Sequence, residues 1–156
     1  MAGITTISPD QEYRNAVIGI VISRFNREIG ERLLHACTSK LIAAGIKEEN
    51  ILLVEVPGAF EIPVAAQRLI NNRSCAAVIT LGAIIRGETP HFEYIASSCS
   101  QGIAGLSIQH DIPVIFGVLT VDTMEQALER SGAEESNKGA DCAIAALDMI
   151  SVMRKI

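Results

Sequence analysis

One short segment of the chain concentrates residues that could do acid–base chemistry. Residues 86–94 read Arg-Gly-Glu-Thr-Pro-His-Phe-Glu-Tyr and follow a strongly apolar run. His91 carries an imidazole, the side chain best suited to accept and return protons near neutral pH. Thr89 and Pro90 suit a helix N-cap and first helical position, which would turn the backbone N–H groups of residues 87–89 toward an anion. Two interpretations stay open: a solvated, well-capped helix start, or a proton-transfer site beside an anion.

Other reaction classes lack their motifs. His91 and Glu93 have the HxE spacing of zinc deaminases, but no PCxxC follows. GxGxxG, the P-loop and GxSxG are missing from the sequence, which argues against common nucleotide sites and a hydrolase elbow. His35 and His110 are interpreted as structural. No metal site is expected.

Two further cations, Arg130 and Lys138, could either bind an anion or have a purely structural role at a helix end. Arg130 falls at the end of a predicted helix, where a cation complements the helix dipole. Lys138 opens the next predicted helix, where a cation is mildly unfavourable and invites another explanation.

Composition limits the size of the protein and its partners. The 156 residues suffice for one domain with a substantial core. The hydrophobic share of 49%, with 12 glycines besides, favours a homo-oligomer that buries additional surface. A net charge of -5 without a basic run argues against binding to nucleic acid or anionic membranes. The longest uncharged apolar stretch, Cys75 to Ile85, is shorter than the ~20 residues that span a bilayer.

The N-terminus and the cysteines predict a cytoplasmic protein. Residues 1–6 lack the basic start and apolar core of a secretory signal. The four cysteines form no CxxC pair, and each lies in an apolar segment: Cys37, Cys75, Cys99 and Cys142. Buried free thiols in a reducing compartment are therefore expected.

Strands and helices alternate along the sequence from residue 15 onward. Apolar β-rich runs predict strands at 15–22, 51–56, 76–84 and 113–119. Helical spacing and cap signals predict helices at about 29–44, 61–70, 90–106, 123–130 and 137–156, with Asp122 to Glu125 as a capping box. Short connections imply right-handed βαβ units. Residues 15–156 are therefore expected to form a single three-layer doubly wound α/β domain with a four-stranded parallel sheet flanked by helices, flavodoxin-like in type. Residues 1–14 form an N-terminal arm, either mobile or adding a strand to a neighbouring subunit.

The predicted topology gathers unusual residues at one edge of the sheet. Ligands of open parallel sheets bind beyond the carboxyl ends of the strands. Phe25, Phe60 and Phe92 fall at or just past these ends, and Phe116 is close to one. Aromatic rings with few polar groups suit a planar ligand with hydrogen-bonding edges. The position of His91 at the same edge favours the functional interpretation of residues 86–94.

Six segments, in order from about residue 16 to the C-terminus, carry a resemblance to a known family. They are Ser23–Asn26, Val56–Pro63, Gly82–Tyr94, Pro113–Thr120, Glu125–Arg130 and Asn137–Gly139. Together they resemble the lumazine synthase family. This resemblance implies a transferase of riboflavin biosynthesis, which condenses 5-amino-6-(D-ribitylamino)uracil with 3,4-dihydroxy-2-butanone 4-phosphate. The products are 6,7-dimethyl-8-ribityllumazine, phosphate and water.

The resemblance also implies roles for individual residues. His91 would transfer protons, and no cofactor is required because both substrates carry their own reactive groups. The ribitylaminouracil would be bound by Phe25, Ala59, Phe60, Glu61, Ala83, Ile84, Ile85 and Phe116. Phe25 would stack on the pyrimidine ring, and Phe116 would be contributed across a subunit boundary. The phosphate substrate would be bound by Glu88, Thr89, Arg130 and Lys138, with Arg130 as ionic anchor. Arg86 and Glu93 are as apt to orient their neighbours as to touch substrate.

The resemblance further predicts the assembly and leaves alternatives open. Residues 132–136 are acidic here, whereas many relatives have a basic, glycine-containing stretch. No insertion is visible in this loop, which favours homopentamers assembled into a 60-subunit icosahedral shell over free pentamers. Whether such a shell encloses a riboflavin synthase stays open. The alternatives are an archaeal-type riboflavin synthase, which dismutates two lumazines on the same fold, and a non-catalytic flavin- or lumazine-binding shell protein.

Overall fold

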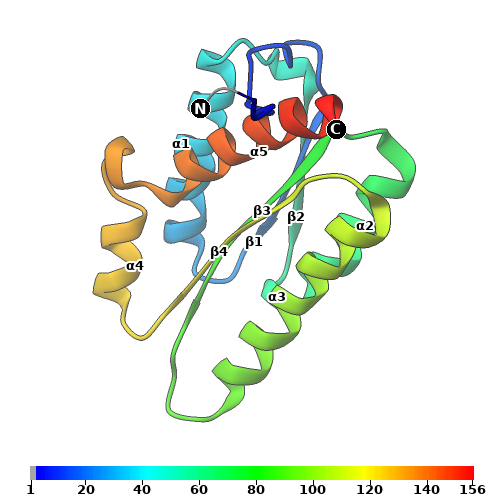
Figure 1. Ribbon diagram of the computed structural model, residues 1–156. Coiled ribbons are helices and arrows are strands. Elements are labelled where there is room, and N and C mark those ends of the chain that lie inside the picture. Colours follow the sequence, from blue (N-terminus) through cyan, green and yellow to red (C-terminus); the bar gives the residue numbers. More distant parts are fainter. Residues whose placement is uncertain (1–2) are drawn as a thin grey trace.

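Four parallel strands form one sheet in the order β2-β1-β3-β4 (Figure 1). The computed structural model describes residues 3–156, apart from the side chain of Glu134. The strands are β1 (Ile18–Ser23), β2 (Ile51–Val56), β3 (Ala77–Ile85) and β4 (Val114–Val121). The predicted doubly wound parallel sheet is confirmed, with strand limits within a few residues of those expected.

Helices cover both faces of this sheet. They are α1 (Arg27–Ala43), α2 (Ile62–Arg73), α3 (His91–His110), α4 (Met124–Arg130) and α5 (Lys138–Lys155). Three short 3-10 turns are η1 (Glu48–Asn50), η2 (Ala59–Glu61) and η3 (Glu134–Ser136). One core cluster joins the sheet to α1, α4 and α5, and the other joins it to α2 and α3 (Figure 1). None of the helices within residues 3–156 combines the length and apolarity needed to span a bilayer.

The side-chain alternation of the central strands explains this double cover. All six residues of β1 are buried. Ile18, Ile20 and Ile22 belong to the α1/α5 core, whereas Val21 belongs to the α2/α3 core. Successive side chains of a strand point to opposite faces, so a strand that is apolar throughout needs helices on both sides. All four cysteines are buried with free thiols.

The different strand lengths leave residues 82–85 of β3 as a ledge at the carboxyl edge of the sheet. β1 pairs with β3 only as far as Ile22 opposite Leu81, but β3 pairs with β4 as far as Ile85 opposite Val121. The last residues of β3 therefore project beyond the end of β1. Gly82 stands at the start of this ledge, where a Cβ atom would lie only 2.3 Å from Ser23 Oγ.

Two predicted helix caps are wrong by one residue. α3 begins at His91 with Pro90 as its N-cap, not with Thr89; Thr89 Oγ1 accepts a hydrogen bond from the His91 N–H at 3.4 Å. The box of α4 pairs Thr123 with Gln126, not Asp122 with Glu125. The β-branched Thr123 adopts the extended backbone that an N-cap requires, and its Oγ1 accepts from the Gln126 N–H at 3.2 Å.

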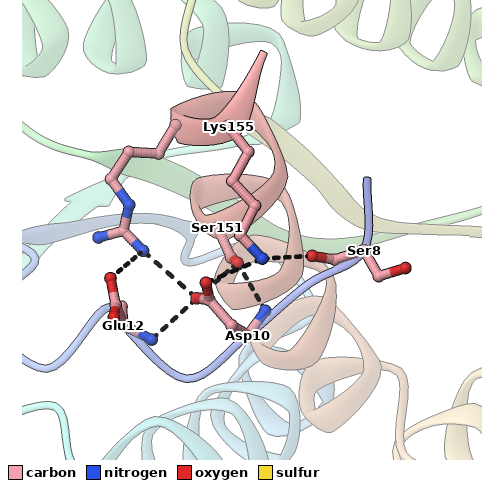
Figure 2. Close-up of polar contacts among 6 residues, drawn as sticks. Ser8, Asp10, Glu12, Ser151 and Lys155 are labelled. Carbon is pink, nitrogen blue, oxygen red and sulfur yellow. Dashed lines mark hydrogen bonds and ion pairs between the residues drawn. The ribbon is translucent and has the colours of Figure 1, made fainter. Parts of the chain in front are cut away.

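Ser8, Asp10 and Glu12 of the N-terminal arm lie beside the end of α5 (Figure 2). Asp10 accepts from Ser151 Oγ at 2.8 Å, and its own N–H donates to that oxygen at 2.7 Å. Lys155 Nζ lies 2.8 Å from Asp10 Oδ2 and donates to the Ser8 carbonyl at 2.6 Å. Residues 1–2 of the predicted arm lie outside the described residues. Residues 8–12 of the arm are thus held by α5 of the same chain.

These contacts hold the pKa of Asp10 well below its ordinary value of 3.8, first through the hydrogen bond from Lys155 and then through the Glu12 N–H and Ser151. A carboxylate with a lowered folded-state pKa stabilises the fold above its ordinary pKa and loses this effect as the pH falls toward the folded value. We expect Asp10→Asn to speed proteolysis of residues 3–16 at pH 7 and to lower Tm slightly. The Tm difference from wild type should shrink as the pH falls below 3.8.

Glu12→Gln is the matched control, because the Glu12 side chain is 83% exposed and 3.9 Å from Arg154. It should leave the arm protected. Equal proteolysis of Asp10→Asn and wild type at pH 7 would contradict the assigned role of Asp10.

Candidate functional site

A cleft of about 710 Å³ opens beyond the carboxyl ends of β1, β2 and β3. Its lining includes most of the residues expected to bind the aromatic substrate, the expected proton carrier and one residue expected to bind the phosphate substrate. The first are Phe25, Ala59, Phe60, Glu61, Ala83, Ile84 and Ile85, and the other two are His91 and Thr89. The ledge at the end of β3 supplies one wall of this cleft. Its location is the one that the parallel topology predicts for a ligand.

Two phenylalanine rings stand largely uncovered at the cleft. Phe25 is 71% exposed and Phe60 is 57% exposed. The Phe25 N–H donates to the Pro57 carbonyl at 3.2 Å, which ties the loop after β1 to the loop after β2. Exposed rings on tethered loops offer flat apolar surfaces on which a planar ligand can stack.

The loops around these rings are held by side chains. Asn26 has a left-handed backbone (φ 56°), and its Nδ2 donates to the Ala83 carbonyl at 2.8 Å. Glu61 Oε2 accepts from the Gly58 N–H at 2.9 Å, which uses one of its two carboxylate oxygens to cap η2. Sequence reasoning did not assign Asn26 a place in the site. An Asn directly before a helix, at the end of a buried strand, was the available signal, because Asn tolerates left-handed backbone.

His91 is the first residue of α3 and is exposed at the cleft. Gly87 and Thr89, on the turn before the helix, also line the cleft. The positive end of the helix dipole therefore lies beside the imidazole. Glu88 is exposed and stands outside the lining of both hollows described here.

The Arg86 side chain is engaged by protein groups. Its Nε lies 2.7 Å from Asp122 Oδ1, and its Nη1 lies 2.5 Å from Glu93 Oε1. The guanidinium also stacks on Phe92, with Cζ 4.4 Å from the ring centroid. In this structure Arg86 and Glu93 thus contact each other, and Arg86 also contacts Asp122 and Phe92.

Three expected site residues lie elsewhere, in a second hollow. Phe116, Arg130 and Lys138 line a space of about 400 Å³ formed by β4, α4 and α5. β4 is an edge strand, and this hollow shares no lining residue with the cleft in the described part of the chain. The chain therefore does not bring Arg130 and Lys138 to His91 by itself.

The second hollow is cationic but partly neutralised. Arg130 Nη1 donates to the Gln126 carbonyl at 3.2 Å and lies 3.8 Å from Glu129. Lys138 Nζ lies 2.8 Å from Asp141 Oδ2, which explains a lysine in the first turn of α5. Both cations are roughly half exposed, at 44% and 52%. An arginine and a lysine in one hollow can hold a phosphate through charge-assisted hydrogen bonds.

The described residues contain no group of three His, Cys, Asp or Glu side chains placed to hold a metal ion. What the chain carries is an aromatic cleft with an imidazole and, apart from it, a cationic hollow. A family model described as 6,7-dimethyl-8-ribityllumazine synthase matches residues 15–154. The match includes every residue of the cleft and of the hollow.

Proposed function

The chain belongs to the 6,7-dimethyl-8-ribityllumazine synthase family, which implies riboflavin biosynthesis, and we propose that it catalyses the family's condensation itself. The reaction joins 5-amino-6-(D-ribitylamino)uracil to 3,4-dihydroxy-2-butanone 4-phosphate and releases phosphate and water. The observation that carries the proposal is the cleft that places exposed Phe25 and Phe60 together with His91. We further propose a cytoplasmic location for the enzyme.

The residues of the cleft suit the chemistry. The 5-amino group of the uracil attacks the ketone, and the carbinolamine loses water to give an imine. Loss of the proton from the adjacent carbon expels phosphate, and the resulting enol tautomerises to a ketone. The ribitylamino nitrogen attacks this ketone, and loss of a second water closes the ring. Each step moves protons near neutral pH, which His91 can accept and return. Phe25 would stack on the pyrimidine, and the free oxygen of Glu61 would bind the ribityl chain. Holding amine and carbonyl together supplies much of the acceleration.

We propose that the cationic hollow of one subunit completes the cleft of its neighbour. The separation of Arg130 and Lys138 from His91 supports this arrangement, because the phosphate must lie near both groups during reaction. Phe116, at 43% exposed, would reach the substrate across the same boundary. A homopentamer repeats this contact around a ring. Assembly of pentamers into a 60-subunit shell, and an N-terminal arm that adds a strand to a neighbour, are part of the same proposal.

The activity test mixes the pure protein with both substrates and follows lumazine absorbance and fluorescence. We expect product formation well above the spontaneous rate. A parallel reaction with lumazine alone tests for an archaeal-type riboflavin synthase, which would form riboflavin. Binding of lumazine without turnover in either reaction would identify a carrier or shell protein and contradict the proposal.

His91→Ala should lower kcat by roughly 100-fold, the usual effect of removing a general acid–base group. Activity should not vanish, because the cleft still holds the two reactants together. His35→Ala is the matched control, since His35 is exposed on α1 away from the cleft, and it should keep wild-type activity. Wild-type turnover in His91→Ala would remove His91 from its assigned role.

Arg130→Ala should raise KM for the phosphate substrate about 10- to 100-fold, the effect of one charge-assisted hydrogen bond. KM for the uracil substrate should change little. An unchanged KM for the phosphate substrate would argue against an ionic anchor.

The same variant tests the shared site. Refolding His91→Ala and Arg130→Ala subunits together should give mixed rings in which about a quarter of the boundaries carry both native halves. At a phosphate-substrate concentration far below the KM of Arg130→Ala, the mixture should then exceed the activity of either variant alone. Mixed rings with no gain would contradict a site built from two subunits.

A further inference from the structure

Arg86 occupies a position that nothing in the proposed reaction assigns to substrate, yet it contacts both the first turn of α3 and the end of β4 with the loop after it. We propose that Arg86 is a positioning residue, whose guanidinium fixes the first turn of α3 and thereby holds His91 in its catalytic place. This inference rests on the proposed function.

The backbone of Arg86 is fixed by a hydrogen bond to β4. Arg86 directly follows the last residue of β3, and its N–H donates to the Val121 carbonyl at 2.9 Å. This bond continues the pairing between β3 and β4 by one residue. The base of the side chain is therefore part of the sheet.

The guanidinium of Arg86 contacts both α3 and the loop between β4 and α4. Glu93 and Phe92 belong to the first turn of α3, and Arg86 binds the first at 2.5 Å and stacks on the second. On its other side it binds Asp122 at 2.7 Å. Asp122 is itself held, because its N–H donates to Gln126 Oε1 at 2.8 Å within the capping box of α4. Arg86 thus ties the start of α3 to a fixed loop.

The first turn of α3 is weakly capped, although the Glu93 N–H donates to the Pro90 carbonyl at 3.0 Å. The first N–H groups of any helix lack partners within the helix. Pro90 at the N-cap has no side-chain acceptor, and the bond from the His91 N–H to Thr89 Oγ1 is long at 3.4 Å. His91 immediately precedes Phe92 and Glu93, the residues that Arg86 contacts. Loss of the guanidinium would free the backbone that carries the imidazole.

Arginine is specifically suited to this task. Its planar fork binds two carboxylates in fixed directions while its face covers an aromatic ring. A lysine would keep the charge and lose the fork and the stacking. The pairs are also exposed, with side-chain exposures of 43% for Arg86, 59% for Glu93 and 64% for Asp122. Exposed pairs add little to global stability, so the effect of Arg86 should be local.

The test is a double-mutant cycle with Arg86→Gln and His91→Ala, assayed with both substrates. Arg86→Gln should lower kcat about tenfold, as expected from a small displacement of a catalytic group, with both KM values and Tm near wild type. Arg86→Lys should stay impaired. In the double variant, kcat should be no lower than in His91→Ala alone, because Arg86 acts through His91. Losses that multiply, or wild-type kcat in Arg86→Gln, would overturn the inference.

Arg32→Gln is the matched control, since Arg32 forms a comparable exposed pair with Glu28 on α1, and it should keep full activity. Amide hydrogen exchange gives a readout that does not depend on catalysis. Peptides covering residues 87–95 should exchange faster in Arg86→Gln, whereas those covering 140–150 should not. Unchanged exchange at 87–95 would overturn the inference. An inactive wild type with faster exchange would instead refute the proposed reaction alone.

Discussion

The parallel pairing of β3 with a shorter β1 on one side and with β4 on the other is the constraint on which the site depends. β3 has nine residues and β1 has six, so the carboxyl end of β3 overhangs its neighbour. The loops after β1 and β2 close around this overhang and form the cleft. Because β4 continues beside β3 to Val121, the turn after β3 leaves the sheet from a paired backbone. The start of α3, and His91 with it, is placed by that turn.

The same topology divides the chemistry between two sides of the chain. β4 is an edge strand, and the helices that follow it leave Arg130 and Lys138 on the outer side. α4 and α5 pack on one face of the sheet and α3 packs on the other, which separates these cations from His91 within one subunit. The proposed reaction, which needs an imidazole and a phosphate anchor together, would therefore require two subunits for one complete site.

Much of the fold could be predicted because burial leaves a periodic signal. Residues 51–56 were predicted as a strand with the observed limits, and the central strands were recognised by their unbroken apolar runs. Helix starts were less certain, because neighbouring residues compete for the same cap. Asp122 and Thr123 are both good N-caps, and Glu125 and Gln126 both complete a box. The backbone conformation determines which of the two pairs forms the capping box, and this conformation cannot be predicted from the spacing of the residues.

In the site, too, sequence patterns predict the apolar parts and miss the polar contacts. The apolar wall of the cleft follows from strand ends, and the aromatic rings follow from the loops after them. The polar contacts that hold these parts join residues far apart in the chain, as Asp10 joins Lys155 and as Arg86 joins Asp122. Such exposed pairs obey no period and contribute little burial, so they are invisible in a hydrophobic pattern. They are also individually weak, which suits a local role: Arg86 can fix one helical turn while the fold is determined elsewhere, by the core.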